Sequence, residues 1–180
     1  MAFAAGRFAE RGYHPTSVAE IVDGIGVGKG VFYWYFDSKE DLFAEILGEA
    51  QLDLRRYQQR HIADEPDPIR RIELGIRATM EWSAANADLL TLVQFASTEE
   101  RFATAIHHGR EVAVEDTIRH LKEGIVEGTI ADTDPVVLAH AIIGVATQLS
   151  WTLIHRGRAD AEHVADAAVS FCRYGLLGRR

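Results

Sequence analysis

Apolar residues recur every three or four positions through most of the chain, which is the spacing of one helix face. The stripe that starts at Phe43 predicts one long helix over about Ser38 to His61, and Ser38 followed by Asp41 is typical of a capping box at its start. Pro66 and Pro68 break the pattern. The later stripes predict further helices over about 69–85, 89–96, 100–127, 135–155 and after Gly157.

The segment from Pro135 to His155 is apolar on nearly every side, which is typical of a helix buried on two faces. About 20 apolar residues can also span a bilayer. Polar residues such as His140 and Gln148 interrupt this segment and would lack partners in lipid, so we expect a protein core helix and no membrane partner. No segment predicts a strand, and the expected fold class is all-α.

Three short helices are predicted at the N-terminus. The first covers Met1 to Arg11 and ends at Gly12, and the second begins at the capping box formed by Ser17 and Glu20. Gly26 supplies the positive φ of a tight turn, and a third helix begins near Gly28. Two short helices joined by a glycine-containing turn are typical of a helix-turn-helix.

The third helix, from Lys29 to Phe36, has an unusual outer face. Phe32 and Phe36 lie four positions apart and can face the core together. The remaining positions hold a lysine, a glycine, a valine and three consecutive aromatic residues, and such a face needs a partner. Lysine and tyrosine can donate to phosphates or base edges, and valine can contact a thymine methyl group. A packed aromatic cluster between helices is the alternative interpretation.

Residues 8–42 carry a recognisable pattern. It comprises Phe8, Gly12-Tyr13, Thr16-Ser17-Val18, Ile21, the unbroken run from Gly26 to Phe36, Ser38-Lys39-Glu40 and Leu42. This pattern resembles the DNA-binding signature of the TetR (tetracycline-repressor) family. The resemblance implies a homodimeric one-component transcriptional regulator, usually a repressor, whose C-terminal helical domain binds a small organic effector that releases DNA. It also implies a double-stranded DNA operator as partner.

The resemblance assigns domains and contacts. It implies a helix-turn-helix domain over residues 1–43, with its first helix truncated at the N-terminus, and an effector-binding and dimerisation domain over 44–180. The implied contacts with the DNA phosphate backbone are Thr16, Ser17, Tyr33, Tyr35 and Lys39, and those towards the bases are Lys29, Gly30, Val31 and Trp34. The implied ligand contacts are Trp82, Phe95, His107, Thr147, Gln148 and Trp151. Dimerisation is expected through Ala141, Val145, Leu149, Ala165, Ala168, Cys172 and Leu176.

The charge balance weakens the case for DNA binding. The chain has a formal net charge of −8, so it gains nothing from non-specific attraction to nucleic acid. Residues 1–43 hold four basic groups (Arg7, Arg11, Lys29, Lys39) against six acids, a net of −2. Gly28 also stands where the family usually has Ser or Thr. An alternative is therefore a ligand-binding or enzymatic helical bundle that retains the fold without specific DNA binding.

The sequence offers few other candidate sites for metal binding or catalysis. The adjacent His107 and His108 point about 100° apart on a helix and cannot chelate one ion, so no metal site is expected. The single cysteine, Cys172, fits a small buried side chain. No nucleophile elbow, phosphate loop or dinucleotide fingerprint is present, so neither an enzyme nor a cofactor is expected. Without a signal peptide, the expected location is the cytoplasm.

Overall fold

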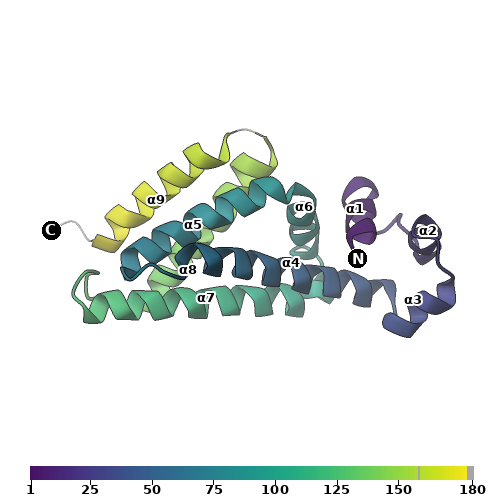
Figure 1. Cartoon of the computed structure of the whole chain (residues 1–180), viewed down its shortest axis with the longest axis horizontal. Coiled ribbons are helices and arrows are strands. Elements are labelled where there is room, and N and C mark those ends of the chain that lie inside the picture. The colour runs from purple at the N-terminus through teal and green to yellow at the C-terminus, as the bar shows by residue number, and fades with distance from the viewer. Residues whose placement is uncertain (158, 178–180) are drawn as a thin grey trace. The chain divides into compact units, whose positions relative to one another are not determined.

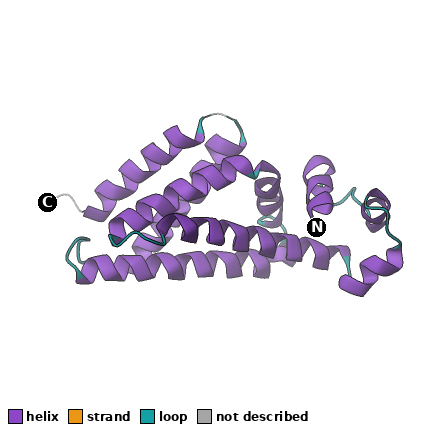
Figure 2. Ribbon diagram, viewed as in Figure 1, coloured by secondary structure: helices purple, strands orange, loops and turns teal. Residues whose placement is uncertain are grey.

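The structure is a computed structural model that describes residues 1–157 and 159–177, and all regular elements in this part are helical (Figure 2). The all-α fold class is confirmed. Figure 1 labels the α-helices. In chain order the elements are α1 (Ala2–Arg11), α2 (Val18–Gly24), α3 (Lys29–Tyr35), α4 (Lys39–Ile62), α5 (Pro68–Ala85), α6 (Ala87–Ala96), η1 (Glu100–Phe102), α7 (Ala103–Val126), α8 (Pro135–Leu149), η2 (Ser150–His155) and α9 (Ala161–Leu177).

The chain folds into two compact units, and each unit is built from two separate stretches of the sequence. The N-terminal unit contains Met1–Leu52 together with Ala87–His107, and the C-terminal unit contains Asp53–Asn86 together with the chain from His108 onward. Both α4 and α7 therefore contribute residues to each unit. The functional domain boundary expected at residue 43 stays a prediction.

An aromatic cluster forms the core of the N-terminal unit. Phe8 of α1 meets Phe43 of α4 edge-on, with ring centroids 5.2 Å apart, and Phe43 lies 4.6 Å from Phe102. Tyr13, in the turn after α1, stacks on Phe95 of α6 at 5.4 Å. Offset and edge-to-face ring pairs of this kind add to the stabilisation from buried area. They explain why α6 packs beside α1 in this unit (Figure 1).

The C-terminal unit has an aliphatic core formed by α5, α7, α8 and α9. Met80 and Leu121 are completely buried there. Ala165, Ala168 and Cys172 of α9 are also buried in this core, where α9 packs closely on α5. The expectation that these three residues meet a partner chain is wrong, because the unit's own core already covers them. Burial raises the pKa of the Cys172 thiol to about 11, as expected for an inert packed side chain.

Of the other positions expected at a dimer interface, Val145 and Leu149 are partly buried and pack against the same core. Ala141 is exposed on α8. The side chain of Leu176 lies outside the described residues.

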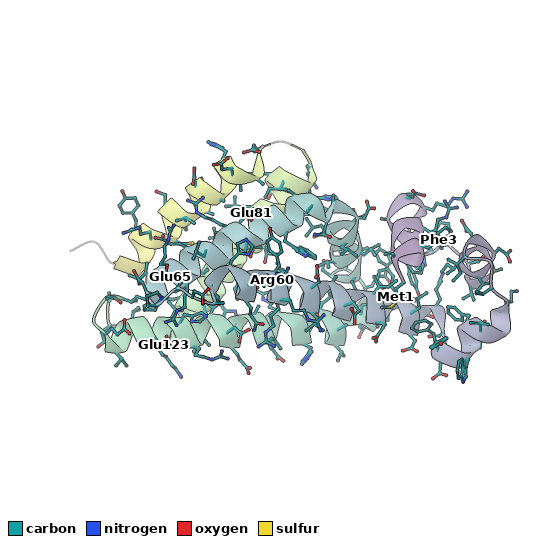
Figure 3. The ribbon with its side chains drawn as sticks, in the orientation of Figure 1. Met1, Phe3, Arg60, Glu65, Glu81 and Glu123 are labelled. Carbon is teal, nitrogen blue, oxygen red and sulfur yellow. The ribbon has the colours of Figure 1, made fainter. Side chains whose placement is uncertain are left out.

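Hydrogen bonds and ion pairs of charged residues connect the helices of the C-terminal unit. The Arg71 guanidinium of α5 donates to the backbone carbonyl of Glu65 at 2.7 Å and to the carboxylate of Glu123 on α7; both glutamates are labelled in Figure 3. The buried Glu73 carboxylate accepts from Arg173 of α9 at 2.9 Å. Buried carboxylates are tolerated when they are paired in this way, so these pairs fix the position of α5.

The predicted helix over Pro135–His155 changes its winding before its end. α8 stops at Leu149, and Ser150–His155 forms one π-helical turn. The segment is long and apolar enough to cross a membrane, but helices of this kind also occur in the cores of soluble proteins. Only 28% of the segment is buried. Val137 and Gln148 lie exposed, so one face of the segment packs in the core and the other is uncovered.

Candidate nucleic-acid interface

The candidate site begins with the cap and turn that set the angle between α2 and α3. The Ser17 hydroxyl accepts a hydrogen bond from Glu20 N at 3.2 Å, as the capping box predicts. Gly26 has a φ of 72°, which glycine adopts without strain. Val27 N then donates to Val22 O at 3.0 Å, and α3 follows directly. The helix-turn-helix expected from the sequence is therefore present in the structure.

α3 presents one buried and one exposed side. Phe32 is 6% exposed and Phe36 is partly buried, so both face the core as predicted. On the other side, Trp34 is 80% exposed, and Tyr33 and Tyr35 are also exposed. The alternative of an aromatic cluster packed between helices is wrong for these three rings. Such a concentration of exposed aromatic area on one short helix marks a surface that binds a partner.

The same exposed side of α3 carries residues of other chemistry. Val31 is exposed beside the aromatic residues. A Cβ atom added at Gly30 would meet nothing within 4 Å, so no internal packing requires a glycine there. Lys29 is exposed and makes no ion pair or hydrogen bond within the described chain. These groups are free to contact a partner.

The other basic groups of residues 1–43 are engaged internally. Arg7 and Arg11 of α1 both donate to the Glu20 carboxylate, Arg11 at 2.7 Å, and Arg7 also pairs with Glu10 at 3.1 Å. The hydrogen bonds from Arg7 and Arg11 lower the pKa of Glu20, against the opposing effect of desolvation. The two arginines thus join α1 to α2, and Lys29 is left as the unpaired cation of this segment.

Two residues expected to contact phosphate make hydrogen bonds within the protein instead. The Thr16 side chain is completely buried, and its hydroxyl donates to Gly12 O at 2.8 Å. The expected phosphate contact by this side chain is therefore wrong, because the hydroxyl is buried and stabilises the turn. The neighbouring Ser17 is exposed. The Lys39 ammonium donates to backbone carbonyls of the same turn.

The six residues expected around an effector are divided between the units. Phe95 and His107 belong to the N-terminal unit, where Phe95 is part of the aromatic cluster and His107 is exposed. Trp82 of the C-terminal unit is buried, and its indole Nε1 donates to the Asp53 carboxylate at 2.7 Å. Trp151 stacks on His155 with ring centroids 4.3 Å apart.

The last two of the six, Thr147 and Gln148, are exposed on α8. A single pocket formed by all six residues stays a prediction. No group of three or more His, Cys, Asp or Glu residues that could hold a metal ion occurs in the described part of the chain.

The central position of Tyr13 in the core behind the site was not predicted from the sequence. Its ring contacts Phe8, Phe43, Phe95 and Phe102 and lies under the Lys39 ammonium. Burial, reinforced by the Glu40 carboxylate, raises the pKa of the Tyr13 phenol. A tyrosine directly after the helix-ending Gly12 was the available signal, but its partners come from α4, α6 and η1 and share no local pattern with it.

Comparison with known proteins identifies the segment that carries this site. The sequence model described as bacterial regulatory proteins, tetR family, matches residues 2–46, which include α1 to α3 and the start of α4. These residues form a TetR-family DNA-binding domain, and the chain is a DNA-binding transcriptional regulator.

Individual relatives are similar to this chain over longer stretches than the family model. The uncharacterised helix-turn-helix transcriptional regulator YdgC of Bacillus subtilis is 25% identical over 97% of this chain and 89% of its own. The transcriptional repressor KstR2 of Mycobacterium tuberculosis is 38% identical over 43% of this chain and 39% of its own. A putative TetR-family regulator from Syntrophomonas wolfei has the same fold, with a TM-score of 0.87 and 23% identity over 99% of this chain and 93% of its own.

Proposed function

We propose that this regulator is a one-component repressor that binds a near-palindromic operator as a homodimer and is released by a small organic effector. The observation that supports the proposal most is the exposed side of α3. Lys29 supplies an unpaired positive charge there, Val31 an apolar contact and Trp34 a ring that can stack. A recognition helix of this kind enters the major groove and contacts base edges. The repressor KstR2 among its relatives supports the direction of regulation.

The proposed DNA contacts divide by chemistry. Lys29, Gly30, Val31 and Trp34 would lie towards the bases, where a lysine donates to guanine and a valine contacts the thymine methyl group. The hydroxyls of Ser17, Tyr33 and Tyr35 would donate to phosphates and fix the register. All of these residues are exposed in the structure, which leaves them accessible to DNA.

Dimerisation is proposed through the uncovered face of α8 and α9. Phe171 and Tyr174 of α9 are 69% and 64% exposed, and Val137 and Ala141 are exposed on α8. Uncovered apolar residues on two helices that pack together are typical of a surface that meets another chain. A two-fold dimer would place two α3 helices in successive major grooves, roughly 34–36 Å apart.

The effector is proposed to be an amphipathic organic molecule of moderate size. Within the C-terminal unit, Trp82 and Trp151 would supply apolar surface, and Thr147 and Gln148 would supply polar contacts. In a cytoplasmic regulator, such a ligand would act by favouring the conformation that binds DNA less well. A thermal-shift screen of organic acids, alcohols and aromatic compounds, followed by DNA release by the compounds that raise the melting temperature, tests this part.

Selection of binding sites from random duplex DNA tests the central proposal. The wild-type protein should enrich an inverted repeat whose half-sites are about one helical turn apart. Lys29→Ala and Val31→Ala should each enrich an altered repeat. Failure of the wild type to enrich any sequence would contradict the proposal.

The second candidate is a helical ligand-binding bundle without specific DNA binding. The internal pairing of Arg7 and Arg11 favours it, because these groups are not available to neutralise phosphates. An equilibrium binding assay at low and moderate salt separates the candidates. Specific binding that survives moderate salt supports the repressor, and its absence under both conditions supports the bundle.

A further inference from the structure

Lys39, in the first turn of α4, directs its ammonium group at the backbone turn that joins α1 to α2. Its Nζ atom lies 2.9 Å from Tyr13 O, 2.9 Å from Thr16 O and 3.4 Å from His14 O. The same atom lies 4.3 Å from the centroid of the Tyr13 ring, within cation–π distance. An ammonium group has three N–H donors, so the three carbonyls account for all of them.

The turn that Lys39 contacts leads directly into α2. Thr16 O is one of the three acceptors, and the next residue, Ser17, caps α2 through its hydroxyl. The Thr16 hydroxyl holds the same turn from the other end through Gly12 O. Lys39 therefore connects the start of α4 to the entry of the helix-turn-helix across more than 20 residues of sequence.

We infer that Lys39 is a positioning residue that holds the turn before α2 against the start of α4, and that it does not bind a DNA phosphate. The family resemblance implies a phosphate contact for this lysine, and the geometry points to a different role. A phosphate contact would require one N–H to leave a carbonyl acceptor. Without that exchange, removal of Lys39 changes the orientation of the helix-turn-helix and leaves the number of neutralised phosphates unchanged.

Arginine distinguishes the two roles at this position. A guanidinium group keeps the positive charge and binds phosphate well, but it is planar and cannot direct three donors at three carbonyls that converge on one point. Lys39→Arg should therefore rescue a phosphate contact and fail to rescue the internal contacts. Lys29, exposed and unpaired on α3, is the matched lysine for comparison.

The first experiment uses the wild-type protein without DNA. The sequence has three lysines, Lys29, Lys39 and Lys122, and both Lys29 and Lys122 are exposed. Acetylation with an activated acetate ester, followed by mass spectrometry, gives a rate for each. Lys39 should react about tenfold more slowly than Lys122, because three hydrogen bonds occupy its ammonium group. Equal rates for Lys39 and Lys122 would overturn the inference.

The second experiment measures affinity against salt concentration, with the duplex that the wild type selects from random DNA. Lys39→Met and Lys39→Arg should both weaken binding about tenfold or more and keep the wild-type salt slope. Lys29→Ala, the comparison, should lower the slope by about one unit if its ammonium reaches a phosphate. A lowered slope in Lys39→Met with wild-type binding by Lys39→Arg would establish the phosphate contact and overturn the inference. Wild-type affinity in both variants would overturn it as well.

The DNA experiment rests on the proposed function, and the acetylation experiment does not. If the wild type selects no duplex, the proposed function fails, while the relative acetylation rate of Lys39 still decides whether the internal contacts exist. Far-ultraviolet circular dichroism and thermal melting establish that each variant is folded at the temperature of the binding assay. A folding defect in the Lys39 variants leaves the acetylation result, obtained on wild-type protein, as the deciding measurement.

Discussion

The ring of Tyr13 stacks on the ring of Phe95, with centroids 5.4 Å apart and planes inclined by 26°. Tyr13 lies between α1 and α2, and Phe95 lies near the end of α6. Phe102 of η1 meets Tyr13 edge-on at 5.4 Å and completes the contact. Residues 87–107 are therefore part of the same packed unit as the helix-turn-helix, although they follow it in the sequence by about 40 positions.

The Tyr13–Phe95 stack predicts an effect of Phe95 on stability in the absence of any ligand. Phe95→Ala should lower the free energy of unfolding by about 2–3 kcal/mol, somewhat less than for a fully buried phenylalanine. Urea denaturation followed by circular dichroism measures the change. Val126→Ala, at a position that is 87% exposed, is the control and should change stability by less than about 0.5 kcal/mol. A Phe95→Ala protein as stable as the wild type would show that the Phe95 ring contributes nothing to stability.

Local sequence signals predicted the candidate site well where the structure depends on neighbouring residues. The capping hydroxyl of Ser17, the positive φ of Gly26 and the two faces of α3 are determined within a few positions of sequence. The TetR signature depends on the same local features. The helices beyond residue 43 were also predicted, since each carries a regular apolar stripe.

Signals of this kind could not predict contacts between distant segments. Lys39 was expected to contact DNA, and its internal role was not predicted because its acceptors are backbone carbonyls, which have no sequence signature. Ala165 and Cys172 were expected at a dimer interface because an apolar stripe does not say which neighbour covers it. The stacking of Phe95 on Tyr13 has no sequence signal for the same reason. The π-helical turn at Ser150–His155 has no periodicity signal in so short a segment.

Substitutions on α3 should separate affinity from base preference. Val31→Ala removes an exposed apolar group that has no role in the core, so the protein should keep its melting temperature and change its preferred bases. Lys29→Ala should do the same and also lower the salt slope if its ammonium reaches a phosphate. Site selection from random DNA with each variant measures the preference. Selected sites identical to those of the wild type would remove both residues from the DNA interface.

The exposed aromatic residues of α9 belong to the proposed dimer interface, so a charge introduced among them should prevent dimerisation. Phe171→Glu should shift the protein from dimer to monomer, because a carboxylate buried without a partner at an interface is strongly unfavourable. Sedimentation equilibrium over a range of concentrations measures the change. Thr104→Glu, at an exposed position of α7, is the matched control and should leave the dimer intact. A Phe171→Glu protein with the wild-type association constant would place the interface elsewhere.

His120 predicts a dependence of stability on pH. Its partial burial, followed by the nearby Arg71 guanidinium, lowers the pKa of its imidazole in the folded protein. The unfolded chain then binds more protons than the folded one below a pH of about 6.5, so stability falls as the pH decreases through that value. His120→Gln should reduce this fall, and His107→Gln, at an exposed position, should leave it in place. Urea denaturation at pH 7.5, 6.5 and 5.5 gives the comparison.

The most direct test of the account is the affinity of Trp34→Ala for the selected duplex, measured by fluorescence anisotropy of labelled DNA. Trp34 is 80% exposed, so its removal should leave the melting temperature unchanged. If the exposed side of α3 binds the major groove, the variant should bind the duplex about tenfold or more weakly than the wild type, which corresponds to at least about 1.4 kcal/mol. Equal affinity of the two proteins would contradict the assignment of α3 as the DNA-binding surface.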